Sequence, residues 1–203
     1  TKIDDVILKH FKEIYKEGEI TKGKNLLAFE VAKRNVYNFL QLEKKDIEAD
    51  QAIKVLLLEA ELSCEIVVKS LPFPIKIAGK VDRIEERNGA IRIIDYKTGK
   101  VDGNSLKIQD FGDLASDIKN EKIIQLLCYA LMFENHELKQ NREVSAGIVS
   151  FKNMKSGFLP FGLGKWKDAE LVISTEILED FKSELETLIL EIFNPEIPFK
   201  EKV

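Results

Sequence analysis

Residues 79–100 read GKVDRIEERNGAIRIIDYKTGK and have the composition of a β-hairpin. Two runs rich in β-branched residues, 75–86 and 90–98, flank the dipeptide Asn88-Gly89. Asn-Gly is strongly preferred in type I′ hairpin turns, because both central residues of that turn have positive φ. The sequence therefore predicts two antiparallel strands joined by a two-residue loop.

The predicted register brings charged side chains together. With a two-residue loop, Asp82 falls directly opposite Asp95. Because side chains alternate along a strand, Lys97 shares the face of Asp95, and Lys80 faces it from the partner strand. We therefore expect two carboxylates and two lysines in one patch.

Two opposed carboxylates destabilise a strand pair, and apolar neighbours such as Ile84 and Ile93 add a desolvation cost. A divalent cation would neutralise the pair, and Mg²⁺ binds through one or two carboxylates when water or phosphate completes its shell. Lys97 could then position the attacking water or steady charge on a phosphate. The alternative is that these side chains form salt bridges at a solvated edge of the hairpin.

The same stretch resembles a known family. GKVDRI at 79–84 and DYKTG at 95–99 are similar to the two acidic motifs of the PD-(D/E)XK nuclease superfamily, in its RecB-like branch. On a helix expected over 123–134, Gln125 and Tyr129 resemble that branch's Gln-x-x-x-Tyr motif, and their spacing puts them on one face. Taken alone, they would be hydrogen-bonded polar groups of an apolar helix.

The resemblance implies a set of site residues. A divalent metal, Mg²⁺ or Mn²⁺, would be held by Asp82, Asp95 and the main-chain carbonyl of Tyr96. Lys97 would be catalytic, and the Gln-x-x-x-Tyr pair would organise the site and hold the nucleic-acid backbone. Relatives often add a histidine from an upstream helix. His10 lacks the pattern around that histidine, and we interpret it as a surface or packing residue.

The likeness covers nearly the whole chain. Residues 23–43, the strand ending at 58–59 and NPEIPF at 194–199 resemble the nuclease domain at the C-terminal end of AddB-like helicase-exonuclease subunits. This implies an α/β, restriction-endonuclease-like core with a mixed central β-sheet flanked by helices. It also implies a DNA exonuclease that processes ends for recombination and repair, with a helicase domain or subunit as partner. We expect a single domain over 1–203, cut from a larger chain.

Composition limits these functions. Lys and Arg total 31 against 35 Asp and Glu, so a net charge of −4 gives no global positive field, and DNA binding needs a local site or a partner. Cys64 and Cys128 are too few for a disulfide framework or a four-cysteine metal site and are expected to be buried thiols. Apolar runs such as 55–58 are too short for a membrane span, and with no secretory leader we expect a cytoplasmic protein.

Hydrophobic periodicity predicts the remaining elements. Helices are expected at 3–15, at 26–42 before the strongly charged segment 43–50, at 123–134, and from Ser174 or Thr175 onward. Strands are expected at 52–68, 144–151 and 171–174, and loops at 102–122 and 157–164. The order of these elements favours an α/β domain with a mixed sheet.

Two other functions remain open at this point. One is a catalytically silent structural or docking module of a helicase-nuclease complex, which the intact acidic motifs and Lys97 disfavour. The other is a metal-dependent phosphoesterase acting on small molecules. Glu59, Glu61 and Glu65 alternate before the hairpin and either supply an extra metal ligand or face solvent at a sheet edge.

Overall fold

The computed structural model describes residues 2–16, 19–112, 114, 117–165 and 167–198. The chain divides into two compact units, 1–51 and 52–203, and each is described by itself. The single domain expected over the whole chain stays a prediction. No described helix is both long and apolar enough to cross a membrane. Positions 113, 115 and 116 of the loop predicted at 102–122, and position 199 of the C-terminal motif, lie outside the described residues.

The first unit is a pair of helices, α1 (Lys2–Tyr15) and α2 (Gly23–Glu48). Phe11 is buried, stacks on Tyr15 with ring centroids 4.4 Å apart, and meets the edge of Phe29 at 5.3 Å. These aromatic contacts join the two helices.

The second helix extends beyond the end predicted for it. α2 continues through the charged segment to Glu48, where Lys44 lies 3.6 Å from the Glu48 carboxylate. The prediction of an end near residue 42 was wrong because it assumed a buried face. No residue of α2 is buried, so Lys and Glu, which are good helix formers, extend it without cost.

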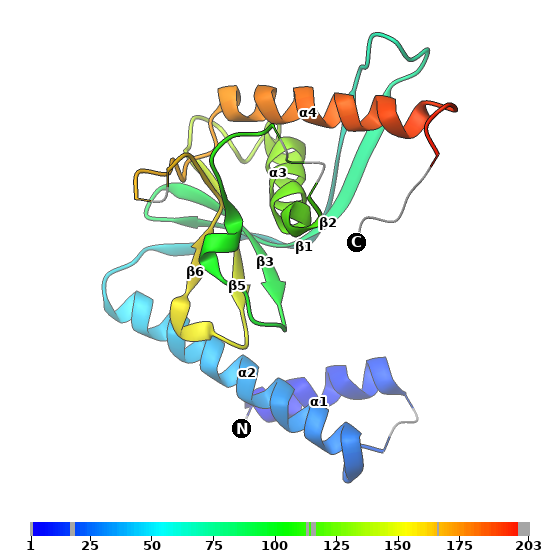
Figure 1. The fold of residues 1–203 in the computed structure, drawn as a ribbon. Helices are drawn as coiled ribbons and strands as arrows, with labels where there is room; N and C mark the ends of the chain where they lie inside the picture. Colours follow the sequence, from blue (N-terminus) through cyan, green and yellow to red (C-terminus); the bar gives the residue numbers. More distant parts are fainter. Residues whose placement is uncertain (1, 17–18, 113, 115–116, 166, 199–203) are drawn as a thin grey trace. The chain divides into compact units, whose positions relative to one another are not determined.

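The second unit is built on a five-stranded sheet with the order β1-β2-β3-β5-β6 (Figure 1). β3 and β5 are parallel and the other neighbours are antiparallel, so the sheet is mixed. This confirms the predicted α/β class. The strands are β1 (Ile53–Ile66), β2 (Ile75–Arg87), β3 (Ala90–Lys97), β5 (Val144–Ser150) and β6 (Phe158–Pro160).

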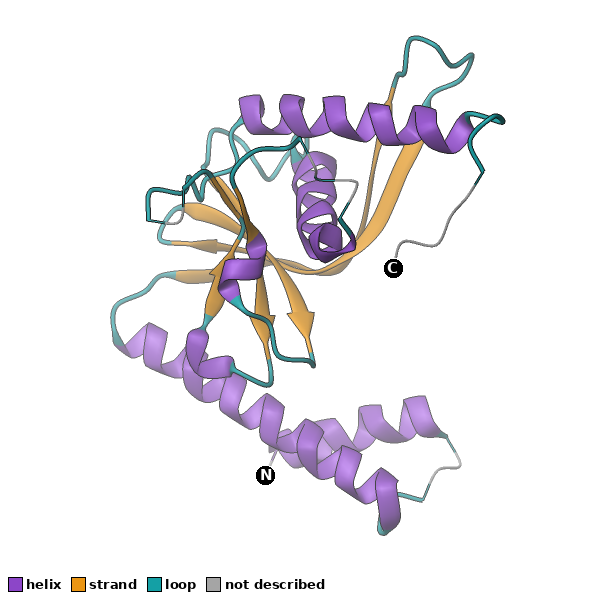
Figure 2. Ribbon diagram, viewed as in Figure 1, coloured by secondary structure: helices purple, strands orange, loops and turns teal. Residues whose placement is uncertain are grey.

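Two helices complete this unit, α3 (Glu121–Phe133) and α4 (Thr175–Phe193). α3 contacts β1, β2, β3 and β5 and also α4. Figure 2 shows this helix beside the strands of the sheet. Its Ile123, Leu126 and Leu127 are fully buried in the core, as the continuous apolar pattern predicted. The Ser174 hydroxyl accepts a hydrogen bond from the Ile177 N–H at 3.2 Å and caps α4 at the expected position.

The predicted loops contain more structure than expected. Residues 102–122 include the 3₁₀ turns η1 (Gly103–Leu106) and η2 (Ile118–Asn120) and the strand β4 (Lys107–Ile108). β4 pairs in parallel with β7 (Gly162–Leu163), which with β6 falls in the loop predicted at 157–164. Such two- and three-residue strands are too short to show a side-chain period.

The strand predicted at 171–174 was wrong. Its neighbourhood makes only an isolated bridge between Leu163 and Glu170, and one hydrogen bond from the Ile173 N–H to the Val144 carbonyl at 2.7 Å. Ser174 is committed to the helix cap instead. Cys64 and Cys128 are free, as expected, but half-buried rather than buried, and burial raises the pKa of Cys128 to about 11.

Gly147 is the tightest glycine position in the sheet and gives a test of the packing between β5 and β6. A Cβ there would lie 2.4 Å from the main-chain oxygen of Leu159 and 2.7 Å from the Phe158 ring. We expect Gly147→Ala to lower the free energy of unfolding by about 1–3 kcal/mol, as overpacking does. Gly99→Ala is the matched control, because its Cβ would meet open space. Urea denaturation of both variants checks this, and equal midpoints would contradict it.

Candidate active site

The hairpin forms in the predicted register but stops short of the two aspartates. β2 and β3 pair from Arg87–Ala90 to Arg83–Ile94, and the turn has positive φ at Asn88 (52°) and Gly89 (87°). Asp82 and Asp95 would be the next pair, and the ladder has ended there. The two carboxylates therefore lie just beyond the last backbone pair of the hairpin.

An irregularity in β2 changes which side chains share a face. The β1–β2 ladder has no pair joining Glu59 to Asp82, and Glu59 has a positive φ of 51°. Along β2, Lys80 is exposed and Val81 buried, whereas Ile84 is buried beyond the irregularity, so the alternation reverses. Lys80 forms an ion pair with Glu59 at 2.6 Å. Its predicted place beside Lys97 was therefore wrong, because the prediction assumed unbroken alternation.

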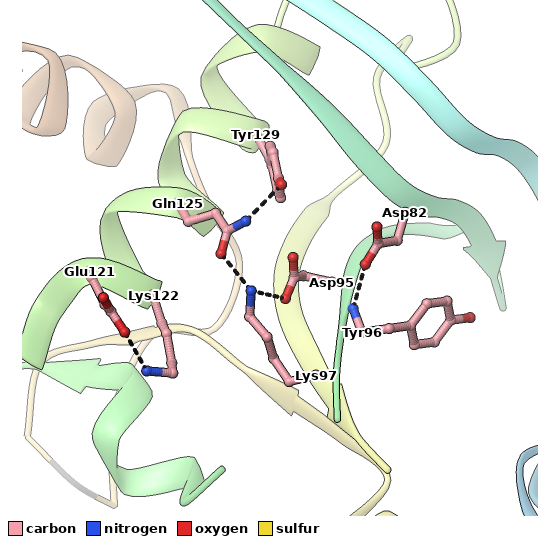
Figure 3. A network of polar contacts seen from close by, with 8 residues as sticks. All are labelled: Asp82, Asp95, Tyr96, Lys97, Glu121, Lys122, Gln125 and Tyr129. Atoms are coloured by element: carbon pink, nitrogen blue, oxygen red, sulfur yellow. Dashed lines mark hydrogen bonds and ion pairs between the residues drawn. The ribbon is translucent and has the colours of Figure 1, made fainter. Parts of the chain in front are cut away.

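Asp82 is held by the backbone of β3. Its Oδ2 accepts a hydrogen bond from the Tyr96 N–H at 2.7 Å (Figure 3). On β3 the Ile91 N–H and the Lys97 carbonyl bond toward β5, at 2.8 and 2.9 Å. Since backbone groups alternate in direction along a strand, the N–H and carbonyl of Tyr96 both point away from β5, toward Asp82. The expected metal-binding carbonyl thus lies on the same side as the first carboxylate.

Asp95 is a buried carboxylate, and Lys97 only partly offsets the desolvation of its charge. Its side chain is 5% exposed, and its Oδ2 lies 2.9 Å from the Lys97 ammonium as an ion pair. Among the described residues, no donor is aligned to hydrogen-bond this buried oxygen. Burial raises the pKa of Asp95, Lys97 opposes that shift, and the nearby charge of Asp82 adds to it. The position therefore favours an additional cation.

α3 supplies a polar chain that holds the lysine. The Lys97 ammonium donates to Oε1 of Gln125 at 3.0 Å, and Nε2 of Gln125 donates to the Tyr129 hydroxyl at 2.8 Å (Figure 3). Burial raises the pKa of Tyr129, which keeps the phenol protonated. The two residues of the Gln-x-x-x-Tyr pattern thus meet the second acidic motif in space, and they fix the Lys97 head group beside Asp95.

Gly79 has a packing role that the sequence analysis did not predict. A Cβ at this position would lie 3.3 Å from both the Tyr129 ring and the terminal methyl of Met132. The absent side chain lets α3 approach β2 closely enough for Tyr129 to reach the site. The only signal for this function was its place at the head of GKVDRI.

Glu121 and Lys122 were also missed, at the first turn of α3. Glu121 precedes Gln125 by one helical turn, and its Oε1 lies 2.8 Å from the Lys122 ammonium (Figure 3). Lys122 lowers the pKa of Glu121, and Lys97 contributes a smaller effect in the same direction. Both residues border the polar chain, and a charged pair at the start of an apolar helix is too common a pattern to identify them from sequence.

The residues present fit a divalent cation. The two strands offer two carboxylates and one carbonyl, all hard oxygen ligands, and the buried Asp95 carboxylate has a raised pKa that a further cation would lower. No group of three or more His, Cys, Asp or Glu side chains gathers among the described residues, so water or phosphate would have to complete the shell. His10 is exposed and 3.0 Å from Glu13 in the first unit. The arrangement therefore suits Mg²⁺ or Mn²⁺.

Comparison with known proteins identifies the family. The model of the PD-(D/E)XK nuclease superfamily matches residues 4–203. The chain belongs to this superfamily. Membership confirms the superfamily assignment made from the two acidic motifs, and it implies nuclease activity. The RecB-like branch and the relation to AddB-like subunits stay predictions.

Two further comparisons add little to this assignment. No curated protein matches the chain. A solved structure titled "Crystal structure of SSO0001" is 15% identical, covers 95% of this chain and 88% of that chain, and superposes with a TM-score of 0.31. A similarity this low supports no inference about activity.

The burial of Asp95 predicts how its neutral isostere behaves. Because the folded state raises the pKa of this carboxyl, ionisation costs stability, and the cost develops as the pH rises from the ordinary aspartate range, about 3.9, through the raised pKa. We expect Asp95→Asn, without added metal, to be at least as stable as wild type at pH 7, with the difference vanishing in acid.

Thermal and urea unfolding from pH 3 to pH 8 with chelator would measure this difference. Asp180→Asn, at an exposed position on α4, is the matched control and should follow the wild type throughout. An Asp95→Asn variant that loses stability as the pH rises, relative to wild type, would overturn the electrostatic account of the site.

Proposed function

We propose that this protein is a divalent-metal-dependent deoxyribonuclease that hydrolyses phosphodiester bonds. The observation that carries the proposal is the geometry of Asp95, a buried carboxylate 2.9 Å from a lysine that Gln125 of α3 holds in place. In this ion pair the carboxylate is buried, at 5% exposure, while the Lys97 side chain is 31% exposed. Membership of a nuclease superfamily gives the arrangement its reaction class.

In this proposal Asp82, Asp95 and the Tyr96 carbonyl hold Mg²⁺ or Mn²⁺. When bound, the ion would polarise the scissile phosphate and make water more acidic. Lys97 has three N–H donors, of which one goes to Gln125 and another faces Asp95. The third is available to hold the attacking water or a phosphate oxygen, so Lys97 orients the nucleophile and balances developing charge.

The hydrogen-bonded side chains of α3 fix the position of the Lys97 ammonium. Gln125 cannot rotate without losing its hydrogen bond to Tyr129, and Tyr129 is confined against Gly79. An ammonium on a flexible four-carbon stem is otherwise free to sample many positions. We assign Gln125 and Tyr129 to positioning Lys97 and, with it, the nucleic-acid backbone.

The finer part of the proposal concerns substrate and partner. Likeness to the RecB-like branch and to AddB-like subunits favours DNA, exonuclease action and end processing for recombination and repair. The net charge of −4 gives the chain little ability to capture a strand by its overall field. A helicase domain or subunit that delivers the strand is the partner that this charge balance supports.

DNA cleavage with a lysine variant tests the activity. Labelled linear and circular DNA, single- and double-stranded, would be incubated with Mg²⁺, Mn²⁺ or chelator. We expect metal-dependent cleavage of linear DNA, and Lys97→Met to lower kcat by about 100-fold or more, the range of a lost catalytic proton-transfer or charge-balancing group. Lys182→Met on α4 is the matched control and should cleave as wild type does.

Full activity of Lys97→Met would refute the site assignment. No cleavage of any DNA by the wild type under these conditions would favour the silent docking module instead. Cleavage of circular DNA at the same rate as linear DNA would replace exonuclease with endonuclease action.

The role of the glutamine can be separated from that of the lysine. In Gln125→Leu, Lys97 keeps its charge and its ion pair with Asp95 but loses its second anchor. We expect kcat to fall by about tenfold, which corresponds to about 1.4 kcal/mol of transition-state stabilisation, while KM changes little. Gln41→Leu, at an exposed position of α2, is the control. A change confined to KM would show that Gln125 binds substrate rather than positioning Lys97.

A further inference from the structure

A groove of about 500 Å³ runs along the free edge of the sheet, away from the candidate active site. One wall is the stretch of β1 from Glu61 to Glu65, and the other is the C-terminal end of α3 and the residues after it, from Leu131 to His136. β1 is the first strand in the sheet order, and within the described part of the chain it pairs with β2 alone. Its outer backbone N–H and carbonyl groups therefore form an open edge.

The groove lies between a strand edge and a helix, an arrangement that can bind an extended peptide. A peptide that adds a strand to a sheet edge gains main-chain hydrogen bonds, and its alternate side chains enter the space beside the strand. Here that space is apolar at depth, because Leu62 and Met132 are buried and Leu131 is half-buried. It admits aliphatic side chains at every second position of an incoming strand.

The side chains of β1 that point away from the apolar groove indicate the charge of the occupant. Glu61 and Glu65 are exposed on that face, and across the ladder they stand opposite Lys80 and Lys76 of β2. Carboxylates thus form the outermost row, with lysines in the row behind. A strand placed next to the carboxylates is stabilised by basic side chains and destabilised by acidic ones.

The same arrangement disfavours a second copy of this chain. Two β1 strands paired edge to edge would place Glu61 and Glu65 of one copy beside the glutamates of the other, and like charges in neighbouring strands repel. An acidic edge is a device that prevents self-pairing while leaving the edge open to a basic strand.

We propose that this groove binds an extended segment of a partner protein, in which basic and aliphatic residues alternate, as an added strand beside β1. Basic side chains of the segment lie over Glu61 and Glu65, and its aliphatic side chains enter the groove against Leu62 and Met132. The proposal is independent of the nuclease assignment, because none of these residues belongs to the candidate active site.

The test uses a hexapeptide of alternating lysine and valine, acetylated and amidated, with fluorescence anisotropy for affinity and NMR for location. We expect amide shifts and slowed hydrogen exchange confined to 61–65 and 131–136. The double variant Glu61→Lys with Glu65→Lys should weaken binding by about tenfold or more. The double variant Asp180→Lys with Glu191→Lys changes the net charge equally at exposed positions of α4 and should bind within about twofold of wild type.

A second peptide separates strand addition from charge attraction. The same hexapeptide, N-methylated at alternate residues so that one edge cannot donate, should also bind about tenfold more weakly. Equal binding of the methylated peptide, equal loss in both double variants, or shifts outside the groove would each overturn the proposal. A dimer of the free chain with protected amides at 61–65 would replace the partner segment with a second copy. Unchanged melting temperatures would confirm that the variants are folded.

Discussion

The hydrogen bond between the Asp82 carboxylate and the Tyr96 N–H stands at the point where the sheet opens. Up to Arg83 and Ile94, β2 and β3 are joined by a regular ladder, and beyond it β2 stays with β1 while β3 stays with β5. The side chain of Asp82 replaces the missing backbone partner and keeps the two strands at a fixed separation. This bond orients the first carboxylate, while the pairing of β3 with β5 sets the direction of the Tyr96 carbonyl. The candidate active site therefore lies where β2 and β3 stop pairing and the Asp82 carboxylate bridges the two strands.

The charges of Asp95 and Lys97 explain why α3 packs beside the point where β2 and β3 stop pairing. Asp95 is nearly inaccessible to water, and among the described residues Lys97 is its ion-pair partner. A buried carboxylate in this state is costly, and such groups are concentrated at functional sites. The Lys97 ammonium is shared between the Asp95 carboxylate at 2.9 Å and Oε1 of Gln125 at 3.0 Å. The structure keeps a negative site next to a positive donor. A divalent ion and a phosphate require this combination, and it has no evident value for stability.

The sequence predicted those features that depend on local chemistry. The Asn88-Gly89 turn determined the hairpin register correctly for five pairs, and the spacing of Gln125 and Tyr129 placed them together. It failed where one residue interrupts a regular period. The irregularity opposite Glu59 reverses the alternation of β2 and moves Lys80 to the far face, and no residue type marks such an irregularity. The length of α2 was missed for a related reason. Hydrophobic periodicity detects a helix through its buried face, and no residue of α2 is buried. Gly79 was missed because the contact it permits, with Tyr129, lies 50 positions away in the sequence.

The parallel pairing of β3 with β5 has a consequence for the order of folding. The hairpin of β2 and β3 closes through a two-residue turn, whereas the pair of Ile91 with Val144 closes a loop of about fifty residues that contains α3. Local closures are faster than non-local ones, so the strands that carry both aspartates meet before the helix that carries Gln125 is fixed in place. For part of its folding the chain thus carries its acidic residues on a solvated ribbon, where water screens their repulsion. Docking of α3 removes that water, so the electrostatic cost of the site is imposed when the helix packs onto the hairpin and not when the hairpin forms.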